Sequence, residues 1–134
     1  MGVHRRFPPT REGARAARTF VASFLADQRV GAQLGDDAGL LTSELVTNAT
    51  LHAGTAFTVG VELSDEKLRI TVAEGDPGPL PPVGPLLLSA EGGRGLAVVA
   101  ALASSWGWAP EGGGKSVWFE LRRSSRNGPT ATAG

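Results

Sequence analysis

The chain has 134 residues, of which 13 are basic and 13 acidic, so its formal net charge of zero argues against bulk electrostatic affinity for nucleic acid or anionic membranes. It has no cysteine, which excludes disulfides, zinc ribbons, thiol catalysis and iron–sulfur clusters. With 41% hydrophobic residues, no apolar run long enough for a membrane span and no secretory signal in residues 1–20, it is expected to be one soluble, cytoplasmic domain.

The N-terminal part of the chain is predicted to form a short strand followed by a helix. Residues 1–9 are polar and contain two prolines, which suits an edge strand or arm that leads into a turn. Thr10 is a suitable helix N-cap, and Glu12 is favourably placed in the first turn. Over residues 10–29 the apolar side chains recur at helical spacing, namely Ala14, Ala17, Val21, Phe24 and Leu25.

A second helix is expected to follow a glycine-containing break. Gly31 and Gly35 are predicted to end the first helix, and Asp36 or Asp37 to cap the next one, which runs to about His52. One face of this second helix is apolar and carries Leu34, Ala38, Leu41, Leu45 and Ala49.

A β-hairpin and a long loop come next. Residues 55–63 and 68–74 alternate apolar and polar side chains around a polar turn, which is typical of a hairpin with one buried face. Residues 75–93 hold too much proline and glycine for regular structure. Loops of this length inside a domain are usually lids or binding loops, so a functional role is expected for this segment.

The C-terminal part is predicted to add a helix over 94–104 and two strands, 106–108 and 115–122, around a triple-glycine turn. Residues 124–134 are expected to form a disordered tail. The order of elements predicts an α+β two-layer sandwich, in which about three helices lie on one face of a mixed, mostly antiparallel sheet and the folded domain spans 10–123.

Glu44, Asn48 and His52 lie four residues apart on the second predicted helix. Such a stripe turns by only about 40° per step, and it overlaps the apolar face of the helix rather than opposing it. Buried polar groups need partners, so a bound metal or polar ligand is one interpretation, and a solvated stripe or one bonded to a neighbouring loop is the other. Zinc would need more histidine or carboxylate ligands, whereas Mg²⁺ accepts amide and phosphate oxygens and fits better.

Glycine-rich and acidic segments follow further along the chain. The motif GGRG at 92–95 opens the predicted third helix, where exposed backbone N–H groups favour phosphate. It matches neither a Walker-type loop nor a dinucleotide-binding fingerprint, and a flexible turn is the alternative. The acidic cluster at 74–76 ends a predicted strand, where a carboxylate could accept a hydrogen bond from a nucleobase amine; the Asp76-Pro77-Gly78 run could equally be an ordinary turn.

Four sequence blocks together carry a family resemblance. They are ELVTNATLHA at 44–53, the acidic strand end before the glycine- and proline-rich loop, GGRGLAVVAAL at 92–102 and GGGKSVWFEL at 112–121. In this order, over about residues 8–122, they resemble the GHKL (Bergerat-fold, histidine kinase-like) ATP-binding superfamily. The likeness extends to its small single-domain branch, the anti-sigma-factor serine/threonine kinases of bacteria.

The resemblance implies roles for the helix stripe and the glycine loop. Glu44 would be the catalytic residue that orients or deprotonates the attacking hydroxyl, and Asn48 would bind the Mg²⁺ that bridges the ATP phosphates. His52 would support the pocket, and residues 77–92 would form a lid over the nucleotide. Cofactor-binding positions in the loop at the helix start would be Gly93, Arg94, Gly95 and Leu96.

The adenine subsite departs from the family pattern. Counted without gaps from His52, the adenine-binding aspartate of the family falls on Glu74, whose extra methylene would push the base outward by about 1.5 Å. Asp76 with Gly78 restores an Asp-x-Gly pattern only after a shift of two residues. Base binding is therefore expected through Glu74 or Asp76, and Ser116 matches a position where the family places a small hydroxyl residue near adenine.

The function that the resemblance implies is an ATP- and Mg²⁺-dependent serine/threonine protein kinase of the anti-sigma-factor type. It would phosphorylate a serine of a STAS-type anti-sigma-factor antagonist, sequester a sigma factor, or do both. Pairing as a homodimer is an expectation, whereas direct nucleic-acid or membrane binding is not. The alternative is a non-catalytic partner-switching module with a degenerate nucleotide site, which the glutamate at position 74 motivates.

Overall fold

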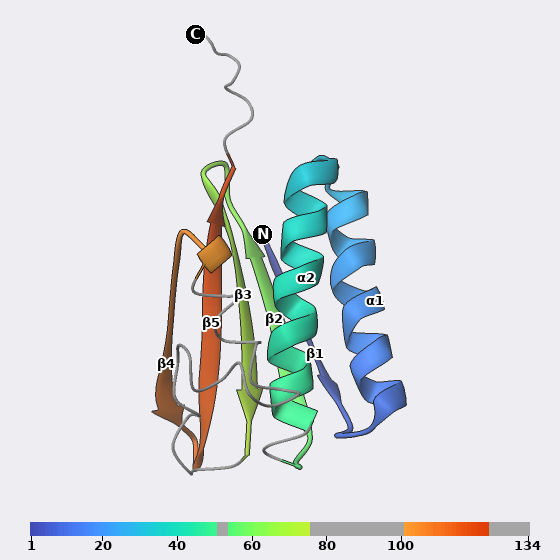
Figure 1. Ribbon diagram of the computed structural model, residues 1–134, viewed down its shortest axis with the longest axis vertical. Coiled ribbons are helices and arrows are strands. Elements are labelled where there is room, and N and C mark those ends of the chain that lie inside the picture. The colour runs from blue at the N-terminus through green and yellow to red at the C-terminus, as the bar shows by residue number, and fades with distance from the viewer. Residues whose placement is uncertain (51–53, 76–100, 124–134) are drawn as a thin grey trace, which may run out of the picture.

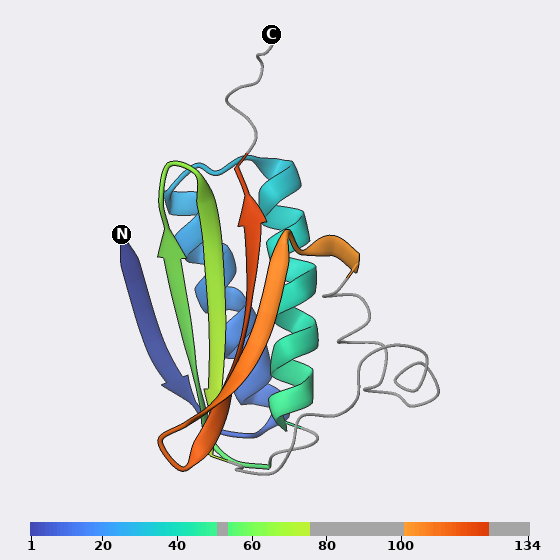
Figure 2. The same ribbon diagram turned by 90° about the vertical axis from the view of Figure 1, so that its left-hand side faces the viewer.

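Five strands and two helices form two layers in the part of the chain that the structure describes. A computed structural model describes residues 1–50, 54–75 and 101–123. Both helices lie side by side on one face of a single sheet, as Figures 1 and 2 show, which confirms the α+β two-layer class. In chain order the elements are β1 (Gly2–Phe7), α1 (Arg11–Asp27), α2 (Ala32–Asn48), β2 (Phe57–Leu63), β3 (Lys67–Glu74), β4 (Ser105–Glu111) and β5 (Gly114–Arg122).

The sheet has the strand order β1-β2-β3-β5-β4, and each described pairing is antiparallel. The hairpin β2–β3 forms where the sequence predicts it, and β4 and β5 form a second hairpin, although β4 is longer than expected. Gly112 and Gly113 connect these last two strands with φ angles of 57° and 84°. A two-residue hairpin turn of type I′ requires positive φ at both positions, which explains the glycines there.

Helix α1 begins where the sequence predicts. The backbone of Thr10 is extended, and its Oγ1 accepts a hydrogen bond from the N–H of Gly13 at 2.9 Å. This bond satisfies one of the free N–H groups of the first turn. The apolar stripe of the helix is buried as expected, with Ala14, Ala17, Val21 and Leu25 facing inward.

Helix α2 begins more than one turn earlier than predicted. The expected caps Asp36 and Asp37 are wrong, because the N-cap is Gly31, with a φ of 98° and no side-chain cap. The N–H of Gly35 already bonds to the carbonyl of Gly31 at 3.0 Å, so Gly35 continues the helix instead of breaking it. Asp37 accepts a hydrogen bond from Gln33 one turn before it, at 3.1 Å. Arg29 and Gly31, with φ angles of 55° and 98°, reverse the chain between the two helices, and a further break at Gly35 is unnecessary.

The predicted third helix is only partly covered by the structure. Ala101 and Leu102 are helical, and the residues of 94–104 that precede them lie outside the described part. The structure therefore describes two complete helices where about three were predicted. The expected lid at 77–92 and the expected tail at 124–134 also lie outside it. Among the described helices, none is both long and apolar enough to cross a membrane.

The core lies between the helices and the strands β2, β3 and β5. Alternate side chains of each strand face the helices, and α2 supplies Leu41, Leu45 and Val46 to the same cluster. Removing this apolar surface from water is the main driving force for the fold. The fully buried residues of these inward-facing rows include Val59, Val61, Ile70, Val72 and Phe119. The same alternation determines which side chains at the ends of the strands also face inward.

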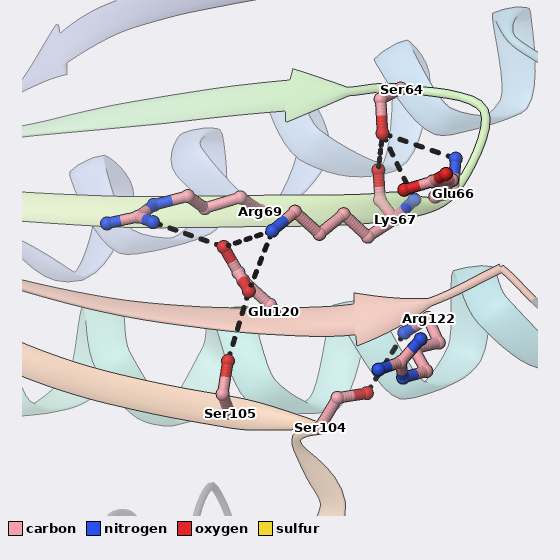
Figure 3. Close-up of polar contacts among 8 residues, drawn as sticks. All are labelled: Ser64, Glu66, Lys67, Arg69, Ser104, Ser105, Glu120 and Arg122. Carbon is pink, nitrogen blue, oxygen red and sulfur yellow. Dashed lines mark hydrogen bonds and ion pairs between the residues drawn. The ribbon is translucent and has the colours of Figure 1, made fainter.

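A charge network around Glu120 of β5 links three strands on the face of the sheet that neither described helix covers (Figure 3). The carboxylate of Glu120 lies 3.2 Å from Lys67 Nζ and 3.1 Å from Arg69 Nη1, both on β3, and accepts a hydrogen bond at 3.0 Å from Ser105 Oγ on β4. The Arg69 guanidinium also lies over the ring of Trp118, 4.1 Å from its centroid. The network therefore ties β3, β5 and β4 together across the open face.

The Glu120 network makes stability depend on pH. Burial alone raises the pKa of the Glu120 carboxyl, but hydrogen bonds from Lys67, Ser105 and Arg69 and the charge of Lys67 outweigh it, so the pKa lies below its ordinary value. A lowered folded-state pKa stabilises the fold above the unfolded-state pKa, and this stabilisation is lost as pH falls through the folded-state pKa. We expect Glu120→Gln to lower the free energy of unfolding by about 1 kcal/mol at pH 7.

Urea unfolding of wild type and Glu120→Gln at pH 7 and at about pH 3 measures this effect. The difference between the two proteins should shrink at the lower pH, because acid protonates this carboxyl first in the unfolded chain, where its pKa is higher, and the folded state loses that advantage. The exposed Glu62 of β2 supplies the control Glu62→Gln, for which little change is expected at either pH. A Glu120→Gln deficit that is the same at both pH values would contradict the prediction.

Gly114 allows β5 to start close against the end of β3. A Cβ at position 114 would collide with the carbonyl oxygen of Glu74, whereas a Cβ at Gly60 would meet only His4 Cβ, at 3.9 Å. We therefore expect Gly114→Ala to lower the free energy of unfolding by about 2–3 kcal/mol, and Gly60→Ala to change it by less than about 0.5 kcal/mol. Urea titration of the two variants tests this, and equal effects would rule the steric explanation out.

Candidate functional site

The C-terminal half of α2 holds two of the predicted site residues, Glu44 and Asn48. They lie one turn apart, about 6 Å along the helix axis. Glu44 is half-buried and Asn48 is 8% exposed, beside the fully buried Leu45 and Ala49. The polar edge of α2 thus borders the core, as its helical spacing predicts, and the amide at position 48 lies on the inward side.

The chain leaves α2 through a widened turn. Residues 49 and 50 continue with π-helical bonding, and the N–H of Gly54 bonds to the carbonyl of Ala49 at 3.2 Å. Gly54 has a φ of 66°, which closes the turn in the left-handed conformation that glycine favours. The hydroxyl of Thr50 is buried here with no hydrogen-bond partner among the described residues. Such widened turns are frequent at functional sites.

The residues on α2 suit one part of a magnesium site. Asn48 carries an amide oxygen at this end of α2 and is 8% exposed. Amide oxygen is an acceptable ligand for a hard cation such as Mg²⁺. In the described ranges, no group of three or more His, Cys, Asp or Glu side chains forms a metal site.

The end of β3 and the start of β5 lie at the same end of the molecule as the C-terminus of α2. Figures 1 and 2 show that β3 ends and β5 begins there, and α2 contacts both strands. Glu74 and Lys115 are directly paired across these strands, and Lys115 Nζ lies 3.2 Å from Glu74 Oε1. Both side chains are only 5% exposed. Glu74, one of the two carboxylates that sequence analysis offers for binding the nucleobase, is therefore already paired with a buried cation.

Lys115 is a residue that sequence analysis missed. It continues the inward-facing row of β5 that holds Val117, Phe119 and Leu121, just as Glu74 continues the row of β3. The two-residue alternation places a lysine at a core position, which in a protein interior requires a charged partner. The alternation in the sequence could have identified Lys115 as an inward-facing residue. It could not have identified Glu74 as its partner, because that depends on the pairing of β3 with β5.

Thr55 fixes the backbone beside this ion pair. Its Oγ1 accepts a hydrogen bond from the N–H of Gly75 at 2.9 Å. The bond joins the segment that follows α2 to the residue that follows β3. It holds the end of β3, and with it Glu74, at a defined height relative to α2.

Ser116 is not brought together with the other predicted residues. It pairs with Ala73 on β3 and Ala109 on β4 and is 7% exposed. Successive side chains of a strand point to opposite faces of the sheet, so Ser116 lies on the opposite face from Lys115, together with Trp118. Its hydroxyl thus belongs to the face that lacks the described helices.

The remaining predicted site residues lie outside the described part of the chain. The structure therefore describes four of the predicted positions, and it brings Glu44, Asn48 and Glu74 to one end of the two-layer sandwich. Those outside are His52, Asp76, Gly78, Gly93, Arg94, Gly95 and Leu96.

Comparison with known proteins agrees with this architecture. Residues 7–121 match the family model of the histidine kinase-like ATPase domain. The chain belongs to this family. Among curated proteins, none matches the sequence. A matching solved structure is that of the RsbU and RsbW domains of Rv1364c from Mycobacterium tuberculosis, with a TM-score of 0.70 and 22% identity. The match covers 91% of this ATPase-domain chain and 32% of the other, which supports the shared fold alone.

Removal of one partner of the buried ion pair in this ATPase domain should destabilise the fold measurably, whereas removal of both should not. We expect Lys115→Met to lower the free energy of unfolding by about 3 kcal/mol, because it removes the cation that compensates a buried carboxylate. The double variant Glu74→Leu with Lys115→Met should recover most of this loss, since it removes both charges. Urea unfolding of the two variants measures the difference. A double variant no more stable than the single one would contradict the pairing.

Proposed function

We propose that this protein is an ATP-dependent regulatory protein kinase of the anti-sigma-factor type. It would phosphorylate a serine hydroxyl of a STAS-type anti-sigma-factor antagonist, sequester a sigma factor, or do both. The observation that supports this most is the inward polar edge of α2, where Asn48 is 8% exposed and Glu44 lies one turn before it. Membership of the histidine kinase-like ATPase family makes ATP the nucleotide for which this edge is suited.

The proposed chemistry assigns one task to each residue of this edge. Asn48 would hold Mg²⁺ through its amide oxygen, and a bound Mg²⁺ neutralises charge on the triphosphate. Glu44 would accept the proton of the serine hydroxyl as that oxygen attacks the γ-phosphorus. The bond from the γ-phosphorus to the bridging oxygen breaks, and ADP leaves with that oxygen. Half-burial suits Glu44 to this task, because a base must be reachable by the hydroxyl and shielded from bulk water.

The glycine loop and the partner are parts of the same proposal. Gly93, Arg94, Gly95 and Leu96 would contact the phosphates, with His52 supporting the pocket. The solved structure that shares the fold carries an RsbW domain beside an RsbU domain, and this chain spans about a third of it. The partner-switching role is the part of the proposal that this likeness supports. A cytoplasmic location and a homodimeric state are further parts of the proposal.

A second candidate function is a non-catalytic partner-binding module. The observation that favours it is the pairing of Glu74 with Lys115 at 3.2 Å in a nearly buried environment. A carboxylate that already accepts from an ammonium group is a weaker acceptor for the amine of a base. In this alternative the same fold would bind a protein partner without productive nucleotide chemistry, and Asp76 with Gly78 would not restore base binding.

Two substitutions separate binding from transfer. We expect Glu44→Gln to keep Mg²⁺-dependent ATP binding and to slow phosphate transfer by about 10²–10⁴-fold, because only the base is lost. Asn48→Ala should abolish Mg²⁺-dependent ATP binding with a modest loss of stability. Asp36→Asn is the matched control, since Asp36 is an exposed acid on the same helix. The measurements are calorimetry with ATP and Mg²⁺, and transfer of labelled phosphate to an antagonist protein that binds the chain.

The outcomes distinguish the two candidates. Transfer by wild type and Asp36→Asn but not by Glu44→Gln supports the kinase. Absence of heat with millimolar ATP and Mg²⁺, together with retained binding of the antagonist, favours the non-catalytic module. Unchanged turnover of Glu44→Gln would refute the base role of Glu44.

A further inference from the structure

Strand β1 forms one edge of the sheet, and half of its backbone groups point away from β2. It pairs with β2 in antiparallel register, and the N–H and carbonyl groups of Met1 and Leu63 bond to each other at 3.0 and 2.8 Å. Hydrogen-bonded pairs alternate in an antiparallel ladder, so the outward N–H and carbonyl groups are those of Gly2, His4 and Arg6. No described residue pairs with this outer side of β1.

A groove runs beside this edge, between β1 and α1. Its volume is about 620 Å³, and its lining includes Phe7, Phe20 and Phe24. The rings of Phe7 and Phe20 lie 5.8 Å apart, and the guanidinium of Arg5 lies 5.2 Å from the centroid of Phe20. Phe20 and Phe24 are half-buried, so the groove exposes apolar surface next to unpaired strand backbone.

The ionisable side chains of β1 itself are all basic. His4, Arg5 and Arg6 are all exposed on β1. Arg15 on α1 lines the groove with Arg5, and the acids that line it are Glu12 and Asp27. On the side of the sheet away from the helices, His4 and Arg6 flank the outward backbone groups. A strand laid beside β1 would therefore meet arginine on both of its faces.

A second copy of this chain is a poor occupant of the edge. Strand β1 carries His4, Arg5 and Arg6 and no acid, so two-fold antiparallel pairing of β1 with β1 would bring basic residues from both copies into one strand pair without an acidic partner for any of them. The C-terminal residues SSRNGPTATAG at 124–134 contain no acid and no large apolar side chain, so they complement neither the charge nor the groove. Charged side chains on an edge strand commonly prevent such indiscriminate pairing.

We propose that β1 is a docking edge for an extended acidic segment of another protein, which adds to the sheet as a sixth strand beside β1. Its backbone would pair with Gly2, His4 and Arg6, and its apolar side chains would enter the groove over Phe20. Its acidic side chains would face His4 and Arg6 on the other side. Backbone pairing supplies affinity in this mode and the alternating side chains supply specificity. The edge would act independently of the proposed nucleotide chemistry.

A pair of substitutions at His4 tests the backbone pairing. The probe is a capped peptide of about seven residues that alternates glutamate and valine, with fluorescence anisotropy as the readout. His4→Pro removes an outward N–H without breaking a bond to β2, and His4→Ala removes the same side chain but keeps the N–H. We expect His4→Pro to weaken binding about fivefold relative to His4→Ala. Equal affinities, or no binding by wild type, would overturn the proposal.

A second measurement keeps the test decisive if His4→Pro fails to fold. Methylation of alternate peptide nitrogens removes the donors that would face β1, and wild-type protein should then lose at least about fivefold in affinity. Methylation of the other set should have little effect. If both methylated peptides bind like the parent, the segment does not add as a strand and the proposal fails.

Charge reversal tests the chemistry of the partner. We expect Arg6→Glu to weaken binding of the acidic peptide at least about tenfold at low salt, and the matched variant Arg122→Glu, an exposed arginine on β5, to leave it unchanged. A lysine–valine peptide should not bind to wild type. Tight binding of that peptide would overturn the proposal. So would a wild-type dimer in sedimentation that His4→Pro dissociates, which would make a second copy the occupant.

Discussion

The buried ion pair between Glu74 and Lys115 is the constraint on which the candidate site depends. It lies where the inward rows of β3 and β5 end, so it marks the point at which the apolar core becomes a polar surface. A buried pair of this kind contributes little net stability relative to an apolar pair of the same size, although removal of one partner is costly. Its physical effect is positional: the two strand ends cannot slide past each other without separating the charges. At the strand ends beside α2, the Glu74 carboxylate therefore shares its acceptor capacity with the ammonium group of Lys115.

The backbone around the pair is adapted to this close approach. Gly114 leaves room for the carbonyl of Glu74, and the hydroxyl of Thr55 holds the N–H of Gly75. On α2, the widened turn after Asn48 brings the chain back to the sheet through Gly54 in the left-handed conformation. Each of these features restricts the backbone locally, and they occur together at one end of the sandwich. Such a concentration is expected where a site, rather than the core, sets the local geometry.

Most of the fold could be predicted from the sequence, because periodicity reports directly on which faces are buried. The alternation in β2 and β3, the stripe of α1 and the cap at Thr10 are local features, and the structure confirms them. The start of α2 could not be predicted in the same way, because Asp36, Asp37 and Gly35 all resemble helix-end residues. Only the φ angle of Gly31 decides between them. For the candidate site, the helical spacing of α2 predicted the inward position of Asn48, and the structure agrees. The partner of Glu74 could not be predicted, since Lys115 becomes its neighbour only when β3 pairs with β5 across a long stretch of sequence.

The edge strand and the candidate site use different parts of the same sheet, yet one row of residues connects them. Phe7 of β1 pairs with Phe57 of β2, Phe57 pairs with Glu74 of β3, and Glu74 pairs with Lys115 of β5. The rings of Phe7 and Phe57 are stacked with their centroids 5.8 Å apart, and Phe57 is 1% exposed. Phe7 also lines the groove beside β1. Because interiors are close-packed, a segment that displaced Phe7 would disturb its stacking on Phe57, which is paired with Glu74. A ligand at the β1 edge that left Phe7 in place would not disturb Phe57. An effect of edge binding on the candidate site therefore requires a bound side chain that enters the groove deeply enough to move Phe7.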